Sequence, residues 1–339
     1  MLKYGPVSSH FDFDSTGKRR GFIDLNHSDD RHAFSLIRLP VGIISGKPGP
    51  TLLITAGNHG DEYEGQVICN RIMQDISPEH LTGRIILLPA LNLPAVRART
   101  RVSPLDNGNM NRSFPGHPDN GPTAAIAGFV NQHLIPMADV ILDFHSGGTA
   151  TKYIDCGYLC WGADDHLNQA NLILADAFGA DFTMLQNIDG TGGDFDTAAY
   201  QQATRFLSCE LGGMGSLSPA SVATGLRGVY GILNYLGMYT LNATSYPQKE
   251  TRLIDVGNDM SYITSAHDGL ASWDIALGQT VKTGDPLATI YHSHNVGEIL
   301  AEIHSPQDGI VAVQRRNPLV EAGDHLFMIC RQIDRSTHC

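Results

Sequence analysis

The chain has 339 residues, of which 42% are hydrophobic and 17% are charged, and its formal net charge is −12. This composition is typical of a globular protein rather than a disordered one, and the length suits one large domain and a smaller one. We expect no nucleic-acid partner, because binding to phosphate backbones depends on clustered Lys and Arg, and the longest basic run is 18-KRR-20.

The same residues indicate a cytoplasmic protein with no membrane contact. No apolar segment is long enough to span a membrane, and residues 1–20 lack the apolar stretch of a secretory signal. The six cysteines form no paired CxxC framework, so we expect reduced thiols. Cys156 and Cys160 could be read as a metal-binding pair, but no second pair completes a closed site, and we interpret both as structural.

In the first two thirds of the chain, short apolar runs alternate with longer helical patterns. Strands are predicted at 51–57 and 84–92, with an amphipathic helix at 64–76 between them, and a further buried strand lies within 139–148. The alternation predicts an α/β sheet. In such sheets ligands bind at the carboxyl ends of the strands, so the residues that follow each strand are the candidates for function.

A histidine and an acid follow the first of these strands, in 51-TLLITAGNHGDEYEG-65, and a second histidine ends the strand in 143-DFHSGG-148. His59, Glu62 and His145 suit Zn²⁺, since a catalytic zinc site uses three such ligands and keeps one position for water. Asp143 or a backbone carbonyl could hold the outer ring nitrogen of a histidine. The simpler alternative is that His59 and Glu62 only cap a helical first turn and that His145 is a satisfied buried histidine.

Two further segments contain polar groups that a hydrolase needs. Residues 97–116, RARTRVSPLDNGNMNRSFPG, are rich in Arg, Asn and turn formers and predict a long functional loop. Its arginines are either solvated surface charges or groups that bind a carboxylate or an oxyanion. Glu210 follows an apolar strand in 205-RFLSCELGGMG-215, and it is either a helix-capping acid or a general base with a raised pKa.

Four motifs in this order, GNHGDEYEG, NMNRSFPG, DFHSGG and SCELGG, resemble the aspartoacylase/succinylglutamate desuccinylase family, which is similar in fold to zinc carboxypeptidases. The resemblance covers roughly residues 30–240, and an ordered set of four motifs is far more specific than any one of them. It implies an α/β fold with a zinc carboxypeptidase-like mixed sheet flanked by helices. It also implies one zinc ion per subunit, held by His59, Glu62 and His145.

The same resemblance implies roles for the remaining polar residues. Glu210 resembles the family's water-activating carboxylate, and Asn111 and Arg112 match its NR pair, which holds the substrate carboxylate. The family's oxyanion arginine lies upstream of that pair. Arg101 is the choice for it here, with Arg99 as the alternative.

The long form of the loop, with SPLDNGNMNRSFPG, resembles a bacterial branch of the family that includes N-α-acetyl-L-2,4-diaminobutyrate deacetylase of ectoine breakdown. The expected activity is therefore the zinc-dependent release of acetate from that small N-acyl amino acid. The alternatives are an aspartoacylase or succinylglutamate desuccinylase acting on another N-acyl amino acid, a zinc carboxypeptidase, and a non-catalytic metal-binding protein. A homo-oligomer is compatible with the composition.

From about residue 250 the sequence changes to short alternating segments punctuated by glycine. We expect a zinc-dependent catalytic domain over 1–250, including an N-terminal β extension, a linker at 242–250, and a C-terminal all-β domain over 251–339. The phrases GQTVKTGDPLATI and SPQDGIVAV resemble a biotinyl/lipoyl-like β sandwich.

A carrier domain of that kind needs a lysine on its hairpin, but the last lysine is Lys282 and the hairpin expected at 291–299 has none. We therefore expect this domain to form the rim of the active-site mouth. His292 and His294 share one face of the hairpin and are interpreted as polar surface, with metal or substrate contact as the alternative.

Overall fold

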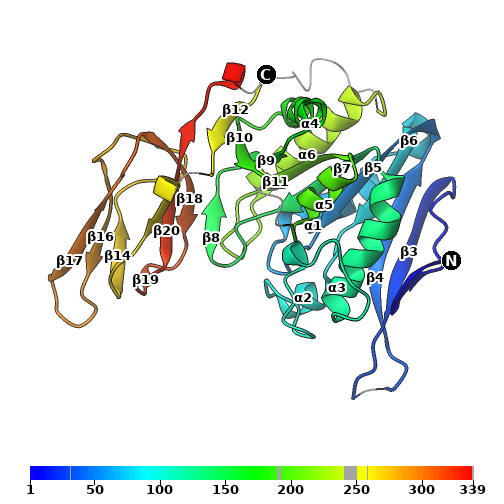
Figure 1. Cartoon of the computed structure of the whole chain (residues 1–339), viewed down its shortest axis with the longest axis horizontal. Coiled ribbons are helices and arrows are strands. Elements are labelled where there is room, and N and C mark those ends of the chain that lie inside the picture. The colour runs from blue at the N-terminus through cyan, green and yellow to red at the C-terminus, as the bar shows by residue number, and fades with distance from the viewer. Residues whose placement is uncertain (31, 189–191, 240–249, 258, 338–339) are drawn as a thin grey trace.

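The computed structural model describes residues 1–30, 32–188, 192–239, 250–257 and 259–337 (Figure 1). Within these residues one continuous mixed sheet of 16 strands extends from the N-terminal part into the C-terminal part, and a second sheet of four strands lies at the C-terminal end. Helices flank the N-terminal part of the large sheet. The predicted α/β class with a separate C-terminal β unit is confirmed at this level.

The spatial order of the strands in the large sheet is β1 (Leu2–Tyr4), β2 (Val7–Ser9), β3 (Gly17–Asn26), β4 (Leu36–Ser45), β6 (Thr82–Leu88), β5 (Lys47–Ala56), β7 (Val140–His145), β11 (Arg205–Glu210), β9 (Cys156–Trp161), β10 (Phe182–Asn187), β12 (Arg252–Asp255), β20 (His325–Gln332), β18 (Gly309–Arg315) and β15 (Thr280–Val281). Two short strands join at the side: β8 (Thr151–Tyr153) pairs with β18, and β13 (Tyr262–Thr264) pairs with β20.

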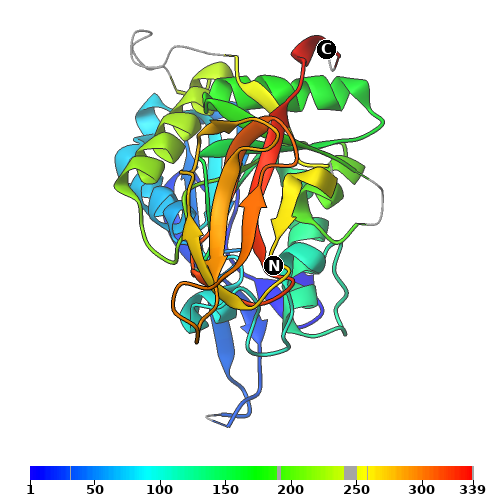
Figure 2. The same cartoon turned by 90° about the vertical axis from the view of Figure 1, so that its left-hand side faces the viewer.

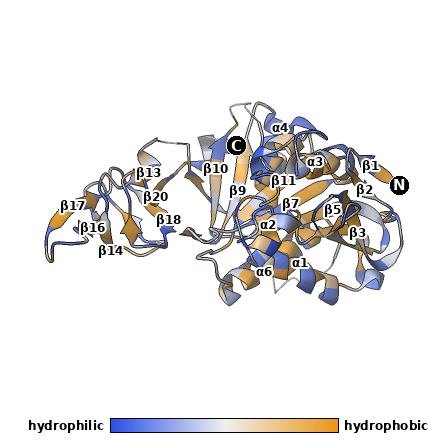
Figure 3. Cartoon of the chain, turned by 90° about the horizontal axis from the view of Figure 1, so that it is seen from below, coloured by the Kyte–Doolittle hydropathy of each residue, from blue (hydrophilic) through white to orange (hydrophobic). Residues whose placement is uncertain are grey.

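Helices cover both faces of the central strands (Figure 3). The α-helices of the described chain are α1 (Glu64–Asp75), α2 (Leu93–Ala98), α3 (Pro122–Phe129), α4 (Asp165–Phe178), α5 (Phe195–Gln201) and α6 (Pro219–Tyr235). Residues of α1, α4 and α6 share one apolar core, and residues of α3 and α5 belong to a second core. None of these helices is both long enough and apolar enough to cross a membrane.

The central strands are parallel and bring their carboxyl ends to one edge of the sheet. β5 pairs in parallel with β6 and with β7, and β7 pairs in parallel with β11. All six residues of β7 are buried, which explains the nearly continuous apolar run in its sequence. The strand predicted at 84–92 is shorter than expected: β6 ends at Leu88, because Pro89 has no N–H to continue the ladder.

The C-terminal part of the chain forms two antiparallel layers (Figure 2). One layer is the end of the large sheet, and the other contains β17 (Ile299–His304), β16 (Pro286–Tyr291), β14 (Gly269–Trp273) and β19 (Leu319–Val320). An apolar core lies between them, in which the rings of Trp273 and Phe327 pack edge to face. The predicted linker at 242–250 lies, except for residue 250, outside the described residues.

The C-terminal layer is also hydrogen-bonded to the segment that follows β7. β8 pairs with β18, so that Tyr153 lies opposite Val313. The C-terminal strands therefore support a segment that lies only a few residues after His145 in the sequence.

Candidate active site

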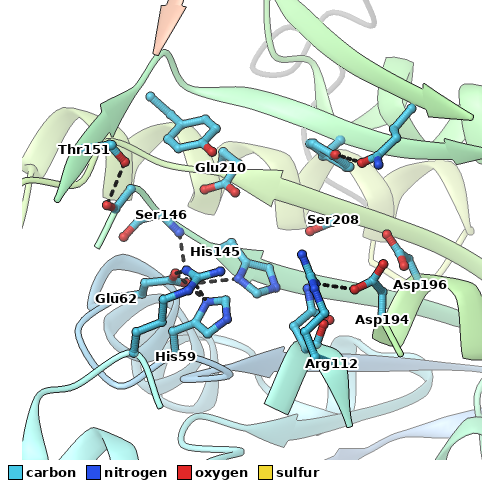
Figure 4. Close-up of a pocket in the computed structure, with 16 residues that line it drawn as sticks. His59, Glu62, Arg112, His145, Ser146, Thr151, Asp194, Asp196, Ser208 and Glu210 are labelled. Atoms are coloured by element: carbon cyan, nitrogen blue, oxygen red, sulfur yellow. Dashed lines mark hydrogen bonds and ion pairs between the residues drawn. The ribbon is translucent and has the colours of Figure 1, made fainter. Parts of the chain in front are cut away.

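The three predicted metal ligands lie together at the carboxyl ends of β5 and β7 (Figure 4). His59 and Glu62 lie in the turn between β5 and α1, and His145 is the last residue of β7. The two oxygens of Glu62 are divided between the histidines: Oε1 lies 2.7 Å from His59 Nδ1, and Oε2 lies 3.0 Å from His145 Nδ1. Among the described residues, this is the only group of at least three His, Cys, Asp or Glu side chains whose donor atoms lie within 4.8 Å of one another.

Two glycines allow the turn that carries His59 and Glu62. Gly57 has a φ of 66°, in the left-handed region that favours glycine. A Cβ atom at Gly60 would lie 2.0 Å from the backbone oxygen of Ala95 in α2. The turn therefore packs against α2 more closely than any side chain would permit.

The outer nitrogen of each histidine is held by a side-chain oxygen. His145 Nε2 lies 2.9 Å from Asp143 Oδ2, which is one of the two partners considered for it, and His59 Nε2 lies 3.1 Å from Asn109 Oδ1. A carboxylate or amide oxygen accepts a hydrogen bond, so each Nε2 can keep its proton when the Nδ1 on the side of Glu62 gives its lone pair to a cation. This is the arrangement that a histidine ligand needs.

All three side chains of this group are buried, with exposed fractions of 3% for His59, 4% for Glu62 and 7% for His145. Burial raises the pKa of Glu62, but the charges of His145 and His59 outweigh it and lower the pKa to about 2. Burial likewise lowers the pKa of His145, whereas Asp143 and Glu62 outweigh it and hold it well above the usual range. So much buried charge requires a proton or a cation between these groups, and the donor set fits a divalent metal.

Glu210 stands beside this group, because its strand runs next to β7. In the sheet register Glu210 is the partner of His145, and both are the last residues of their strands. Its Oε2 is buried and has no hydrogen-bond partner among the described residues. Burial and then the charge of Glu62 raise the pKa of Glu210 to about 8. A carboxylate with a raised pKa and an unused oxygen is suited to accept a proton from water.

The two arginines left open by the sequence have different positions. Arg101 lines the cavity that contains Glu210, with Nη1 3.3 Å from His59 Nδ1 and 3.8 Å from Glu62 Oε1. Arg99 follows the last turn of α2 in a left-handed conformation and does not line that cavity. The geometry therefore favours Arg101.

Asn111 and Arg112 line the same cavity from the loop side. They belong to a short 3-10 turn, Met110–Arg112. Asn111 Oδ1 accepts a hydrogen bond of 2.9 Å from Phe195 N, and Arg112 Nη1 forms an ion pair with Asp194. The predicted NR pair is thus joined to the beginning of α5.

Sequence reasoning did not identify several residues of this cavity. Among them are Tyr153, Tyr158, Asp194 and Asp196. The two aspartates follow a glycine-rich stretch, 190-GTGG-193, which is a turn signal that could have drawn attention to them. The tyrosines carry no motif, and only the packing of β8 and β9 brings them to the cavity.

The other sequence candidates lie outside the metal group. Cys156 is buried, and the Cys160 thiol donates to Asp196 Oδ2 over 2.7 Å. In the connection between β16 and β17, His294 is exposed and His292 is half-buried, and neither lines the cavity. Nδ1 of His292 accepts backbone hydrogen bonds from residues 294 and 295, which agrees with its interpretation as a surface residue.

The chain is similar to known proteins along nearly its whole length. A family model described as the succinylglutamate desuccinylase/aspartoacylase catalytic domain matches residues 48–236. An N-alpha-acetyl-L-2,4-diaminobutyric acid deacetylase from Halomonas elongata is 35% identical over 329 residues, which cover 97% of this chain and 96% of that protein.

Solved structures give the same result. The product-bound ectoine utilization protein EutE (DoeB) from Ruegeria pomeroyi has a TM-score of 0.91 at 34% identity, and the match covers 97% of this chain and 100% of that chain. A succinylglutamate desuccinylase from Silicibacter sp. TM1040 has a TM-score of 0.91 at 32% identity, with coverages of 98% and 100%.

Proposed function

The chain belongs to the succinylglutamate desuccinylase/aspartoacylase family, and on this premise we propose that it converts N-α-acetyl-L-2,4-diaminobutyrate and water into L-2,4-diaminobutyrate and acetate. It is a hydrolase of N-acyl amino acids, as the members of this family are. The similarity to the Halomonas elongata deacetylase and to the ectoine utilization protein supports this substrate and a role in ectoine degradation.

One observation carries the proposal. Glu210, with a buried and unpartnered oxygen, lines the same cavity as three side chains that together can hold a metal ion. A protein that only bound a metal would not need a water-activating carboxylate beside it.

His59, Glu62 and His145 would hold one Zn²⁺ ion. Their two imidazole nitrogens and one carboxylate match the donors of known catalytic zinc sites, and the outer nitrogens are already fixed by Asn109 and Asp143. A zinc ion supplies Lewis acidity, which lowers the pKa of water and polarises the amide carbonyl.

Glu210 acts as the proton carrier. It accepts a proton from the attacking water, and it returns this proton to the nitrogen of the departing amine when the amide C–N bond breaks. The Glu210 carboxylate is therefore deprotonated again at the end of the cycle. One water is consumed for each acetate released.

Three residues bind the substrate and exchange no proton with it. Arg101, at the cavity wall next to His59, stabilises the negative charge that develops on the amide oxygen. Arg112 and Asn111 hold the α-carboxylate of the substrate, for which a planar guanidinium is well suited. The contact of Asn111 with Phe195 fixes the position of this pair.

We also propose that the chain divides into a zinc carboxypeptidase-like catalytic domain over 1–250 and a biotinyl/lipoyl-like domain over 251–339 that acts as a support rather than a carrier. The pairing of β18 with β8 favours this role, because Tyr153 of β8 lines the cavity. A cytoplasmic location and a homo-oligomer belong to the same proposal, and cell fractionation and analytical ultracentrifugation test them.

Acetate release with metal analysis tests the proposed function. The purified protein is offered acetyl, succinyl and aspartyl amides of several amino acids, with and without a chelator, and its zinc content is measured. We expect about one zinc per chain, release of acetate from N-α-acetyl-L-2,4-diaminobutyrate, and loss of activity with the chelator. Turnover that persists at full rate without metal, or no acetate release from any acetylated amino acid, would contradict the proposal.

A further inference from the structure

Two aspartates of the cavity have no role in the proposed reaction. Asp194 and Asp196 lie at the start of α5 and face the side of the cavity that carries Arg112 (Figure 4). Asp194 occupies the N-cap position of α5, yet its side chain makes no capping hydrogen bond and pairs with Arg112 instead. Asp196 accepts hydrogen bonds from the Cys160 thiol over 2.7 Å and from Thr197 N over 2.6 Å.

These aspartates are fixed to the loop that carries the NR pair. Besides the bond from Phe195 N to Asn111, Phe114 N donates to Gly193 O over 3.0 Å. The rings of Phe114 and Phe195 are stacked, with centroids 4.6 Å apart and an interplanar angle of 9°. The carboxylates therefore keep a defined position relative to the Arg112 guanidinium, as a recognition site requires.

The charges on the side of the cavity that carries Arg112 favour a cationic group in the substrate. Two carboxylates, Asp194 and Asp196, lie there with one guanidinium, and among the described lining residues of the cavity there is no lysine. Glu62 belongs to the metal group and Glu210 to proton transfer. The buried, unpartnered oxygen of Glu210 shows independently that the cavity is arranged for a ligand.

We infer that Asp194 and Asp196 form a subsite for an ammonium group at the end of the substrate side chain. This inference rests on the proposed function, since it names the part of the substrate that each wall of the cavity recognises. The α-carboxylate binds Arg112, and the side-chain ammonium binds the two aspartates beside it. The Arg112–Asp194 ion pair thus faces a substrate that carries one negative and one positive group. Each group of the substrate lies next to a protein side chain of opposite charge.

The same carboxylates exclude other substrates of the family. A succinyl-glutamate or acetyl-aspartate substrate has a carboxylate in its side chain, which would approach two like charges in a partly buried position. Burial raises the pKa of Asp196, so an incoming cation also relieves the cost of keeping that carboxylate charged. Specificity of this kind depends on repulsion as much as on attraction.

Isosteric substrates and charge-neutral variants test the subsite. The holoenzyme is assayed with N-α-acetyl-L-2,4-diaminobutyrate, with N-acetyl-L-norvaline as the uncharged isostere, and with N-acetyl-L-aspartate. We expect kcat/KM to fall about 10–100-fold from the first substrate to the second, as for loss of one charged hydrogen bond, and further for the third. In Asp194→Asn and in Asp196→Asn, the ratio of kcat/KM for the cationic over the uncharged substrate should fall by a similar factor.

The ratio is the decisive readout, because a variant that is only partly folded loses activity on both substrates equally. Asp75→Asn, on the exposed end of α1, is the matched control and should keep the wild-type ratio. If the wild-type enzyme hydrolyses both substrates equally well, or if both aspartate variants keep the ratio, the subsite is wrong although the deacetylase function stands. If no acetylated amino acid releases acetate, the proposed function itself is wrong.

Discussion

The two walls of the cavity differ in how their functional side chains are mounted. The strand-end wall consists of His59, Glu62, His145 and Glu210, all at or just after the carboxyl end of a central parallel strand. The loop wall consists of Asn111, Arg112, Asp194 and Asp196, in the turn before α3 and at the start of α5.

The side chains of the two walls are also exposed to different degrees. Those of Glu62 and His145 are 4% and 7% exposed, whereas those of Arg112 and Asp194 are 61% and 32% exposed. The sheet thus holds the side chains of the strand-end wall away from bulk solvent, where charges interact strongly. The loop wall meets solvent, as expected for groups that must release a product. The contrast suggests that bond breaking depends on the first wall and substrate choice on the second.

Removal of a ligand from the strand-end wall should have the largest effect. We expect His145→Ala to lose bound zinc and to reduce activity to background, because only two ligands remain and the buried Asp143 carboxylate loses its 2.9 Å contact with the imidazole. Metal analysis of the purified variant and acetate release measure this. Full zinc occupancy in His145→Ala would remove this residue from the ligand set.

Glu210→Gln should separate metal binding from catalysis on the same wall. The amide keeps the shape of the side chain but cannot take the proton, so we expect normal zinc content and a kcat that is lower by about 10²–10⁴-fold. Steady-state kinetics with parallel metal analysis test this. A variant that turns over at the wild-type rate would show that another group is the base.

Arg112→Ala tests the loop wall. Its guanidinium binds substrate in both the ground and transition states, so we expect mainly a higher KM, with kcat/KM lower by about 10–100-fold. Zinc content should not change. Arg71→Ala, an exposed arginine on α1, is the matched control. A fall in kcat with an unchanged KM would place Arg112 in the chemical step and would remove the contrast between the walls.

The pH dependence should reflect burial on the strand-end wall. The pKa of Glu210 is raised to about 8, chiefly by burial, and a base works only after its proton has left. Activity should therefore decline as the pH falls through this pKa, about tenfold per pH unit. Bound zinc offsets the charge of Glu62 and shifts the midpoint downward, yet burial should keep it above the 4.5 of an ordinary glutamate. The profile of kcat/KM measures this, and the residual activity of Glu210→Gln should lack the decline.

The two walls also differ in what the sequence can predict. His59, Glu62, His145 and Glu210 each follow an apolar strand, so the strand pattern alone places them at one edge of the sheet, and the structure brings all four together. Of the two partners left open for His145, Asp143 or a backbone carbonyl, the structure has Asp143.

The loop wall could be predicted only in part. Arg112 and Asn111 were found through a family motif, but their partners Asp194 and Phe195 lie about 80 residues later in the chain, with no shared periodicity. Tyr153 depends on the pairing of β8 with β18, a contact between distant segments that no local pattern encodes. The boundary between the domains stays a prediction.

The smallest expected effects come from two glycines, one near each wall. Gly60→Ala introduces a methyl group 2.0 Å from the backbone of Ala95, so the turn must move, at a cost of about 1–3 kcal/mol in the free energy of unfolding. Gly192→Ala meets no atom within 4 Å, and its φ of 72° adds only backbone strain of about 1–2 kcal/mol.

The expected losses in free energy of unfolding are similar for Gly60→Ala and Gly192→Ala, but zinc affinity should distinguish the two variants. Movement of the turn displaces His59 and Glu62, so Gly60→Ala should bind zinc more weakly, whereas Gly192→Ala should bind it normally and show at most an altered KM. Thermal unfolding together with a competitive zinc titration measures both properties. Equal zinc affinity in the two variants would mean that the strand-end wall does not depend on the close packing of its turn against α2, and its rigidity would then have to come from the sheet alone.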